Sequence, residues 1–249
     1  SMKRLGYGLP SEVGVESEQL VKVDSIMEFA MSKEATPGGQ ILVARGGTVI
    51  YDKSFGYHSY DKKRAVDWTD LYDLASVTKI TATLPGVMNW YEKQPLLLES
   101  TVGQQLPELA TSDKGNLVLE DVLAHQSGLP AWIPYYLRTI ETDSAKAYWY
   151  VSSDTPGVIK VTEELYLRPE IRDTMYAILE QSELKGNEYR YSDLGYYLFQ
   201  RMLEKRNNEP LDTWVQTTFY APLGASRLTY KPLENGFDLE EVVPTEEDS

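Results

Sequence analysis

The sequence predicts a mixed fold of the α/β (α+β) class, in which a small antiparallel sheet is combined with a larger helical region. Two apolar, β-branched runs at residues 40–45 and 48–55 are joined by Gly46-Gly47, a pattern typical of a β-hairpin. Apolar residues at helical spacing lie on both sides of the hairpin. They predict helices over residues 17–32, 76–92, 120–125, 169–181 and 193–206.

Three of these helices have a well-defined apolar stripe. In the helix over 193–206 it consists of Leu194, Tyr197, Leu198, Met202 and Leu203. The stripe of the helix over 17–32 consists of Leu20, Val23, Ile26, Met27 and Ala30. The stripe of the helix over 76–92 consists of Val77, Ile80, Leu84, Val87, Met88 and Tyr91. Residues 132–161 are rich in Tyr, Pro and Ser and lack a clear period, so we expect loops there.

The hairpin requires further strands, because a two-stranded ribbon cannot cover a hydrophobic face by itself. The remaining sequence shows no convincing strand. We therefore expect the chain to be part of something larger, although 249 residues with 42% hydrophobic content can bury a sizeable core.

The composition excludes several classes of function. Asp and Glu total 38 against 24 Lys and Arg, and the formal charge of −14 disfavours binding to nucleic acids and anionic membranes. Cysteine is absent, which removes disulfides, thiol catalysis and thiolate metal sites. We expect the two histidines in structural roles, His58 in a turn or at a sheet edge and His125 in a local hydrogen bond. No apolar run approaches the roughly 18 residues of a membrane span.

The spacing Ser-x-x-Lys is the first candidate for chemistry, because residues three apart share a helix face and a lysine amine can accept a serine proton. The spacing occurs at Ser59/Lys62, at Ser76/Lys79 and at Ser182/Lys185. Only Ser76 begins an amphipathic helix. At the border of a buried face Lys79 would be partly desolvated, which lowers its pKa. Alternatively, Ser76 is an N-cap and Lys79 a surface residue.

A second candidate lies just before the helix over 193–206, in the run Tyr191-Ser192-Asp193. A phenol on a loop fixed by a helix start could transfer a proton beside Ser76. In the alternative interpretation Asp193 is the N-cap of the helix and Tyr191 is a packing residue.

The segments Ser76-Val77-Thr78-Lys79, Leu123 to Leu129 (Leu-Ala-His-Gln-Ser-Gly-Leu) and Tyr191-Ser192-Asp193 together resemble the penicillin-binding-protein and serine β-lactamase superfamily, especially its class C-like members. The resemblance covers nearly the whole chain and is strongest to the β-lactamase-like module that follows some family 3 glycoside hydrolases (β-N-acetylglucosaminidases). It implies an antiparallel sheet flanked by helices and a large helical lobe. We expect one such domain over 1–249, incomplete at its C-terminus, with its sheet at about 17–60 and its lobe at about 76–230.

Carried over by position, the resemblance makes Ser76 the acylated nucleophile, Lys79 its proton acceptor and Tyr191 a general base and acid. Asp193 stands where the family usually has Asn, which affects how a substrate amide or the Lys79 ammonium is held; an acid there could pair with Lys79 and keep it charged. The third motif of the family, Lys-Thr-Gly or His-x-Gly on a late strand, is absent from the sequence. That strand normally donates an oxyanion N–H, so we expect this chain alone to be a poor catalyst.

The resemblance predicts a serine hydrolase that acts on cell-wall peptide, ester or β-lactam substrates through an ester on Ser76. It implies no metal and no organic cofactor, a periplasmic or envelope location, and as partners a missing C-terminal segment or an upstream glycosidase module. One alternative is a catalytically idle binding or interaction module attached to a glycosidase. A second is a Ser-His hydrolase that depends on His125 instead of Lys79.

Overall fold

The structure is a computed structural model that describes residues 5–95, 97–153, 155–162, 164–186 and 188–246. The chain divides into two compact units. Ser1–Ala75 and Gln216–Ser249 form the first, here named the sheet unit, and Ser76–Val215 form the second, here named the helical unit. Each unit is described by itself.

The sheet unit is built on the predicted hairpin. Strands β2 (Gly38–Arg45) and β3 (Thr48–Gly56) pair antiparallel, with Gly38 opposite Gly56. Gly46 and Gly47 both have positive φ, 57° and 80°, which a two-residue turn of the type favoured in hairpins requires. The short strand β1 (Gly6–Tyr7) runs parallel to β3 on its other side, so the order is β1-β3-β2. The hairpin prediction is confirmed.

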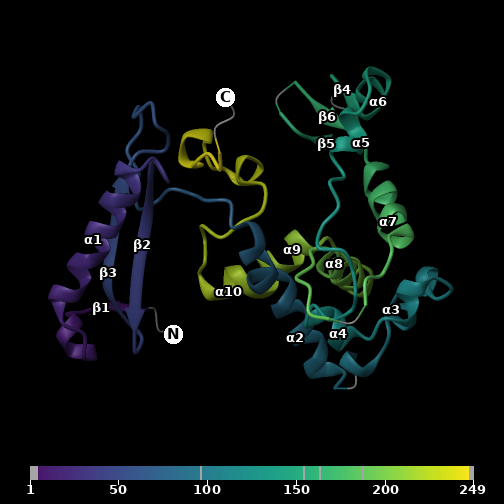
Figure 1. The fold of residues 1–249 in the computed structure, drawn as a ribbon, viewed down its shortest axis with the longest axis horizontal. Helices are drawn as coiled ribbons and strands as arrows, with labels where there is room; N and C mark the ends of the chain where they lie inside the picture. Colours follow the sequence, from purple (N-terminus) through teal and green to yellow (C-terminus); the bar gives the residue numbers. More distant parts are fainter. Residues whose placement is uncertain (1–4, 96, 154, 163, 187, 247–249) are drawn as a thin grey trace. The chain divides into compact units, whose positions relative to one another are not determined.

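Helix α1 (Ser17–Ser32) lies along this hairpin (Figure 1) and has the predicted bounds. None of its residues is fully buried, and Ile26, which the predicted stripe places in the core, is 66% exposed. Val21 and Phe29 on the same helix are exposed as well. In the described part of the chain β2 pairs with β3 alone, which leaves its outer edge free of a strand. The apolar surface of the sheet unit is therefore larger than its present elements cover.

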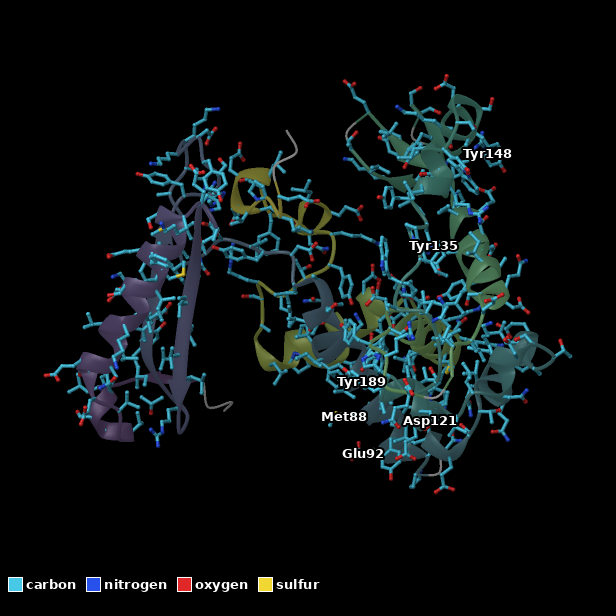
Figure 2. All side chains as sticks on the ribbon, in the orientation of Figure 1. Met88, Glu92, Asp121, Tyr135, Tyr148 and Tyr189 are labelled. Carbon is cyan, nitrogen blue, oxygen red and sulfur yellow. The ribbon has the colours of Figure 1, made fainter. Side chains whose placement is uncertain are left out.

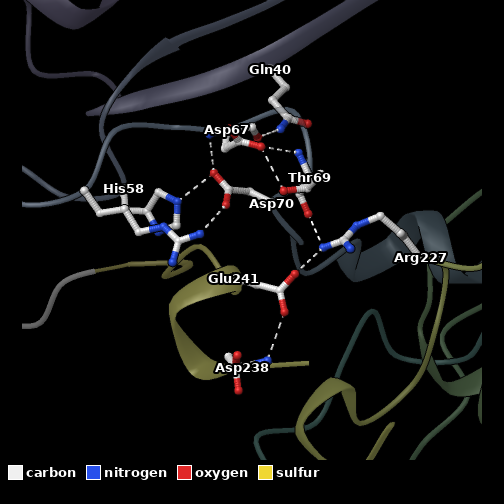
Figure 3. Close-up of polar contacts among 9 residues, drawn as sticks. Gln40, His58, Asp67, Thr69, Asp70, Arg227, Asp238 and Glu241 are labelled. Atoms are coloured by element: carbon white, nitrogen blue, oxygen red, sulfur yellow. Dashed lines mark hydrogen bonds and ion pairs between the residues drawn. The ribbon is translucent and has the colours of Figure 1, made fainter. Parts of the chain in front are cut away.

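A buried polar network ties the loop after β3 together (Figure 3). The Asp70 side chain is fully buried and accepts hydrogen bonds from Arg64 at 3.1 Å and from the Asp67 N–H at 2.5 Å. His58 Nε2 lies 2.7 Å from Asp70 Oδ2, the oxygen that also accepts the Asp67 N–H, and His58 is only 7% exposed. His58 lies in the turn that follows β3, as expected, and the Asp70 carboxylate gives its buried imidazole a polar partner.

The C-terminal stretch completes the sheet unit with short helices. These are the π-helix η7 (Gln216–Tyr220), α10 (Ala221–Leu223) and the 3₁₀ helices η8 (Pro232–Asn235) and η9 (Leu239–Glu241). Arg227 links the network to this stretch, since it donates to the Thr69 carbonyl and, at 2.8 Å, to Glu241 (Figure 3). The two sequence-distant parts of the unit are therefore joined by hydrogen bonds, including those between the backbones of Leu71, Glu241 and Val243.

The helical unit has α8 (Leu194–Asn207) at its centre. Leu194, Leu198, Phe199 and Leu203 of this helix are buried. It contacts the helices α2 (Leu84–Lys93), α4 (Leu119–Leu123) and α9 (Leu211–Val215). Further elements of this half include η4 (Leu97–Glu99), α3 (Val102–Gln105), η5 (Pro107–Leu109), η6 (Asp113–Asn116) and α7 (Ile171–Gln181).

The predicted helix over 76–92 is composite. It consists of a 3₁₀ turn, η2 (Ala75–Val77), then a π-helical turn, η3 (Lys79–Thr83), and then α2. Its buried face is made by Ala82, Thr83, Gly86, Val87 and Trp90. The predicted stripe was wrong, because Met88 is 62% exposed and a Cβ on Gly86 would lie 2.7 Å from Leu203 of α8. Small residues allow close helix packing, and a pattern based on large apolar side chains cannot find them.

Residues 132–161 are also more regular than expected. They contain α5 (Leu137–Ile140), α6 (Asp143–Trp149) and strand β4 (Tyr150–Val151). Together with β5 (Ile159–Lys160) and β6 (Tyr166–Leu167), strand β4 forms an antiparallel sheet of order β4-β6-β5. The prediction of loops was wrong. Thr142 caps α6 by accepting the Ala145 N–H at 3.0 Å, a local signal that the sequence does contain.

Candidate active site

Ser76 lies in the tight turn η2 and its side chain is exposed. The residue before it, Ala75, has a φ of 42°, in the left-handed region that residues with a Cβ rarely adopt. Asp73 holds this conformation, because its Oδ1 accepts the Ala75 N–H at 2.7 Å. A strained turn therefore precedes the serine, as is often found where a side chain must be presented at a defined position.

Lys79 is the first residue of the π-helical turn η3, three residues after Ser76, and its side chain points back to the serine. Its Nζ donates to Ser76 Oγ at 3.0 Å and to Asp193 Oδ1 at 2.6 Å. The lysine side chain is only 13% exposed, and the aspartate side chain 33%. The structure thus brings together three of the four residues that the sequence singled out, from two segments far apart in the chain.

The charge state of Lys79 differs from the expectation. Burial lowers the pKa of Lys79, but hydrogen bonds to Asp193 and Tyr191 outweigh burial and raise it above its ordinary value. The lowered pKa expected from burial alone was wrong, because the Asp193 carboxylate forms an ion pair with the amine. Lys79 is therefore an ammonium ion at neutral pH.

Tyr191 is the fourth candidate and lies against the same amine. Lys79 Nζ is 4.9 Å from the centre of the Tyr191 ring and 5.7 Å from that of Tyr196, within the range of a cation–π contact. Hydrogen bonds to Lys79 and to Ser76 lower the pKa of the Tyr191 phenol. A phenol with a lowered pKa next to a serine hydroxyl can accept a proton more readily than an ordinary tyrosine.

Asp193 occupies the N-cap position of α8 but makes no side-chain cap hydrogen bond. Its carboxylate contacts Lys79 instead. The backbone N–H of Leu194 at the start of the helix is satisfied by Ser192 Oγ at 3.2 Å. The neighbouring serine thus serves the helix start, and Asp193 is available to the site.

The loop that carries Tyr191 is fastened to the turn over residues 125–131. Ser192 Oγ donates to the Pro130 carbonyl at 2.6 Å, and the Asp193 N–H donates to the Ala131 carbonyl at 2.8 Å. Further contacts come from His125, which accepts the Arg190 N–H on its carbonyl and the Ser192 N–H on its ring. Tyr189, labelled in Figure 2, lies at the beginning of the same loop. Sequence reasoning noted His125 but not this connection, because contacts over long sequence separations leave no local pattern.

The other two Ser-x-x-Lys pairs serve different contacts. Ser59 Oγ donates to Asp61 at 2.6 Å. Ser182 Oγ donates to the Leu179 carbonyl at 2.7 Å, at the end of α7. Both hydroxyls are used locally, which leaves the pair at Ser76 as the candidate site.

Two general features of the described residues bear on the chemistry. They contain no group of three or more His, Asp or Glu side chains placed to hold a metal ion. Within the same ranges, no helix is both long and apolar enough to cross a bilayer.

Comparison with known proteins places the chain in a family. The sequence profile of the Beta-lactamase family matches residues 23–249, which is most of the chain. The chain belongs to the Beta-lactamase family. The fold and the superfamily that the sequence predicted are thereby confirmed.

The individual relatives share less than 30% of their residues with this chain. The N-acetylmuramyl-L-alanine amidase of Bacillus subtilis (strain 168) is 28% identical over 245 residues, covering 92% of this chain and 50% of its own length. A protein of Salmonella agona (strain SL483) named "Putative D-alanyl-D-alanine carboxypeptidase" is 26% identical over 250 residues, covering 95% and 53%. The chain thus spans about half the length of the curated relatives it matches.

Solved structures agree on the fold. The octameric penicillin-binding protein homologue from Pyrococcus abyssi has a TM-score of 0.66 at 19% identity, with 90% of this chain and 47% of that chain covered. A class C β-lactamase gives 0.63 at 19% identity, covering 92% and 54%. EstCE1, described as a hydrolase with promiscuous acyltransferase activity, gives 0.63 at 24% identity, covering 91% and 56%.

Proposed function

We propose that this chain carries the nucleophile and the proton-transfer groups of a serine hydrolase, with Ser76 as the residue that is acylated. The observation that carries the proposal is the 3.0 Å hydrogen bond from Lys79 Nζ to Ser76 Oγ, with the Tyr191 phenol in contact with both. A serine hydroxyl is a weak nucleophile until a neighbouring group accepts its proton. The site supplies that group without a histidine base.

Tyr191 is the proton acceptor that the charges favour. Asp193 keeps Lys79 protonated, and the ammonium in turn stabilises the phenolate form of Tyr191. The phenolate takes the proton of Ser76 as Oγ bonds to the substrate carbonyl carbon. The bond to the leaving nitrogen or oxygen then breaks, and that atom receives the proton from Tyr191. Lys79, which the family resemblance makes the acceptor, acts in this scheme as the fixed positive charge.

The second half of the reaction repeats these steps with water. Tyr191 accepts a proton from water, whose oxygen bonds to the ester carbonyl, and the bond to Ser76 Oγ breaks. Oγ recovers a proton from Tyr191, which releases the free acid and restores the site. The backbone N–H of Ser76 supplies one donor to the negative oxygen formed in each half.

The substrate class follows from chemistry and from the names of the relatives. Two of them are named for cleavage of cell-wall amide or peptide bonds, and one structural neighbour for acyl transfer. We assign to this chain an acyl donor of the same kind: a cell-wall peptide, an ester or a β-lactam, with β-lactams turned over more slowly than peptides or esters. A periplasmic or envelope location fits such substrates. The subgroup linked to glycosidases stays a prediction.

The site needs a second oxyanion donor, and in our proposal a further segment or partner chain supplies it. The support is threefold: the chain spans half the length of its relatives, β2 has a free edge among the described residues, and α1 exposes Val21, Ile26 and Phe29. In this view the two units belong to one incomplete β-lactamase-like domain. Loss of one oxyanion donor costs about 10²–10³ in rate, so the chain alone turns over slowly.

Covalent labelling of the whole chain tests the proposal, since a small reactive probe does not need a complete substrate groove. Intact-mass analysis after treatment with a fluorophosphonate is expected to show one adduct, located at Ser76 by peptide mapping. Ser76→Ala serves as the matched control and is expected to stay unmodified. An unshifted mass for the unaltered chain would instead favour the idle binding module. A rate that depends on His125 but is unchanged in Lys79→Ala would favour the Ser-His hydrolase.

A further inference from the structure

His125 joins two segments that are far apart in the sequence. Its ring nitrogen Nδ1 accepts the Ser192 N–H at 3.1 Å, across 67 positions of the chain. Its backbone carbonyl accepts the Arg190 N–H at 2.8 Å. Both donors flank Tyr191, so one histidine fixes the backbone before and after the phenol that contacts Ser76.

The imidazole also packs against the aromatic side chains of the site. Its ring centre lies 4.5 Å from that of Tyr191 and 5.4 Å from that of Tyr196, which it stacks on. Tyr189 meets it edge-on at 6.2 Å. The ring therefore limits the direction of the Tyr191 side chain as well as the path of its backbone.

The hydrogen bond from Ser192 determines the protonation state. A nitrogen that accepts a hydrogen bond must carry a lone pair, so the ring is neutral and its proton is on Nε2. An imidazolium ion has protons on both nitrogens and would direct one at the Ser192 N–H. Protonation of Nδ1 would thus replace the hydrogen bond from the Ser192 N–H with a repulsion between two N–H groups.

We infer that His125 is a positioning residue, whose neutral imidazole holds the Tyr191 phenol against Lys79 and Ser76 and whose protonation releases it. The inference rests on the proposed function, which it deepens by adding an acid-sensitive support to the same site. No contact between the imidazole and the serine is needed for this role.

The groups around the imidazole set the pH at which it is protonated. Burial and the nearby Lys79 ammonium lower the pKa of His125 below the ordinary 6.5, and Asp193 opposes them in part. We therefore expect the His125–Ser192 hydrogen bond to persist in mildly acidic solution and to be lost at lower pH. The titratable groups around the ring are Lys79 on η3, Tyr189 and Tyr191 on the loop, Asp193 and Tyr196 at the start of α8, and the exposed Glu120 and Asp121 on α4, the helix that ends two residues before the histidine.

The backbone of His125 makes a sharp test possible. Its φ is 60°, a conformation that Asn tolerates better than most residues. In His125→Asn the amide oxygen can take the place of Nδ1 as acceptor, but it cannot be protonated in the range of interest. In His125→Leu the acceptor is lost. His125→Gln is the matched control, because its oxygen lies one bond further out, near the position of Nε2.

The first experiment measures the rate of fluorophosphonate labelling at Ser76 from about pH 4.5 to 9. We expect the unaltered chain to show an extra loss of rate below pH 6.5, on top of the titration of the base. His125→Asn is expected to keep most of the rate at neutral pH and to lack the extra acid step. His125→Leu and His125→Gln are expected to be slower than the unaltered chain by about tenfold at neutral and alkaline pH, the worth of one hydrogen bond. In acid the difference should shrink, because protonation breaks the same hydrogen bond in the unaltered chain.

The second experiment needs no reactivity at all. NMR of the isotopically labelled chain is expected to show the Nε2–H tautomer for His125 and a Ser192 amide shift that follows the titration of the ring. If Ser76 proves unreactive, the proposed function fails while this titration still decides the role of His125. The inference is overturned if the Ser192 amide ignores the titration, if His125→Asn retains the acid step, or if His125→Leu labels as fast as the unaltered chain.

Discussion

Lys79 and Asp193 form an ion pair of 2.6 Å although they are 114 positions apart in the chain. The pair joins the turn after Ser76 to the start of α8, and it fixes the amine on the side of the serine hydroxyl. Its charge also has a chemical consequence. A lysine held as an ammonium ion cannot accept a proton, but it makes every neighbouring oxygen a better anion.

Asp193→Asn is the direct test of this charge. The substitution keeps the shape but removes the anion that raises the pKa of Lys79 and also opposes ionisation of Tyr191. We expect the midpoint of the pH–rate profile for Ser76 labelling to move towards acid, by about one pH unit or more. An unchanged midpoint would contradict the proposed role of the pair.

The same pair predicts a pH dependence of stability. The pKa of Lys79 is raised on folding, so the contribution of the pair is fully present below the ordinary lysine value of 10.5 and is lost as the pH rises through the raised value. Urea unfolding of the unaltered chain and of Asp193→Asn is therefore expected to differ at pH 7 and pH 9 alike. The difference should shrink only in strong alkali.

Substitutions of Lys79 separate its charge from its ability to carry a proton. In Lys79→Met the phenol of Tyr191 loses the cation that lowers its pKa, and we expect labelling of Ser76 at pH 7 to fall about 100-fold or more. Lys79→Arg keeps a permanent charge and is expected to lose less. If Lys79→Arg is as slow as Lys79→Met, the amine itself transfers the proton and the assignment to Tyr191 is wrong.

Some of this site could be predicted from the sequence and some could not. Ser76 and Lys79 are three residues apart, so their spacing predicted that the two side chains lie close together. Gly46-Gly47 located the hairpin, because adjacent glycines favour a two-residue turn. The charge of Lys79 depends on Asp193, and the placement of Tyr191 depends on His125. Those contacts exist only after the chain has folded, and local spacing contains no information about them.

In the fold, too, local features could be predicted from the sequence and tertiary contacts could not. Helix α1 was predicted with its observed bounds, yet Ile26 faces solvent in the structure. Over 76–92 the large apolar side chains suggested one face, whereas Ala82 and Gly86 lie on the face that packs. Periodicity identifies a helix, but the partner decides which face is buried, and small residues give close approach without a hydrophobic signal.

Asp70 is expected to stabilise the sheet unit. Its carboxylate is fully buried, and Asp70→Ala would leave His58, Arg64 and the Asp67 N–H without their acceptor. We expect a loss of about 3–5 kcal/mol in the free energy of unfolding, measured with urea. The control is Asp61→Ala, which removes an exposed pair with Lys63 in the same loop and is expected to change little. Equal losses in both variants would contradict the importance of burial.

Gly128 is expected to be essential for the support of the Tyr191 loop. It has a φ of 75°, its carbonyl accepts the Lys185 N–H at 2.7 Å, and a Cβ at this position would lie 2.3 Å from the Gly186 carbonyl oxygen. Because the contact is with backbone, no side-chain rotation can relieve it. We expect Gly128→Ala to lose about 3 kcal/mol or more of unfolding free energy, from the left-handed φ and the clash together.

Gly186→Ala is the matched control for this prediction. Gly186 has a similar φ of 66°, but a Cβ there meets no atom within 4 Å. Its substitution is expected to cost only the conformational strain, about 1–2 kcal/mol. Ser76 labelling should slow in Gly128→Ala and stay near the normal rate in Gly186→Ala, because only the first separates the turn over 125–131 from the segment that leads to Tyr191. If both variants label normally, the position of the phenol does not depend on this contact.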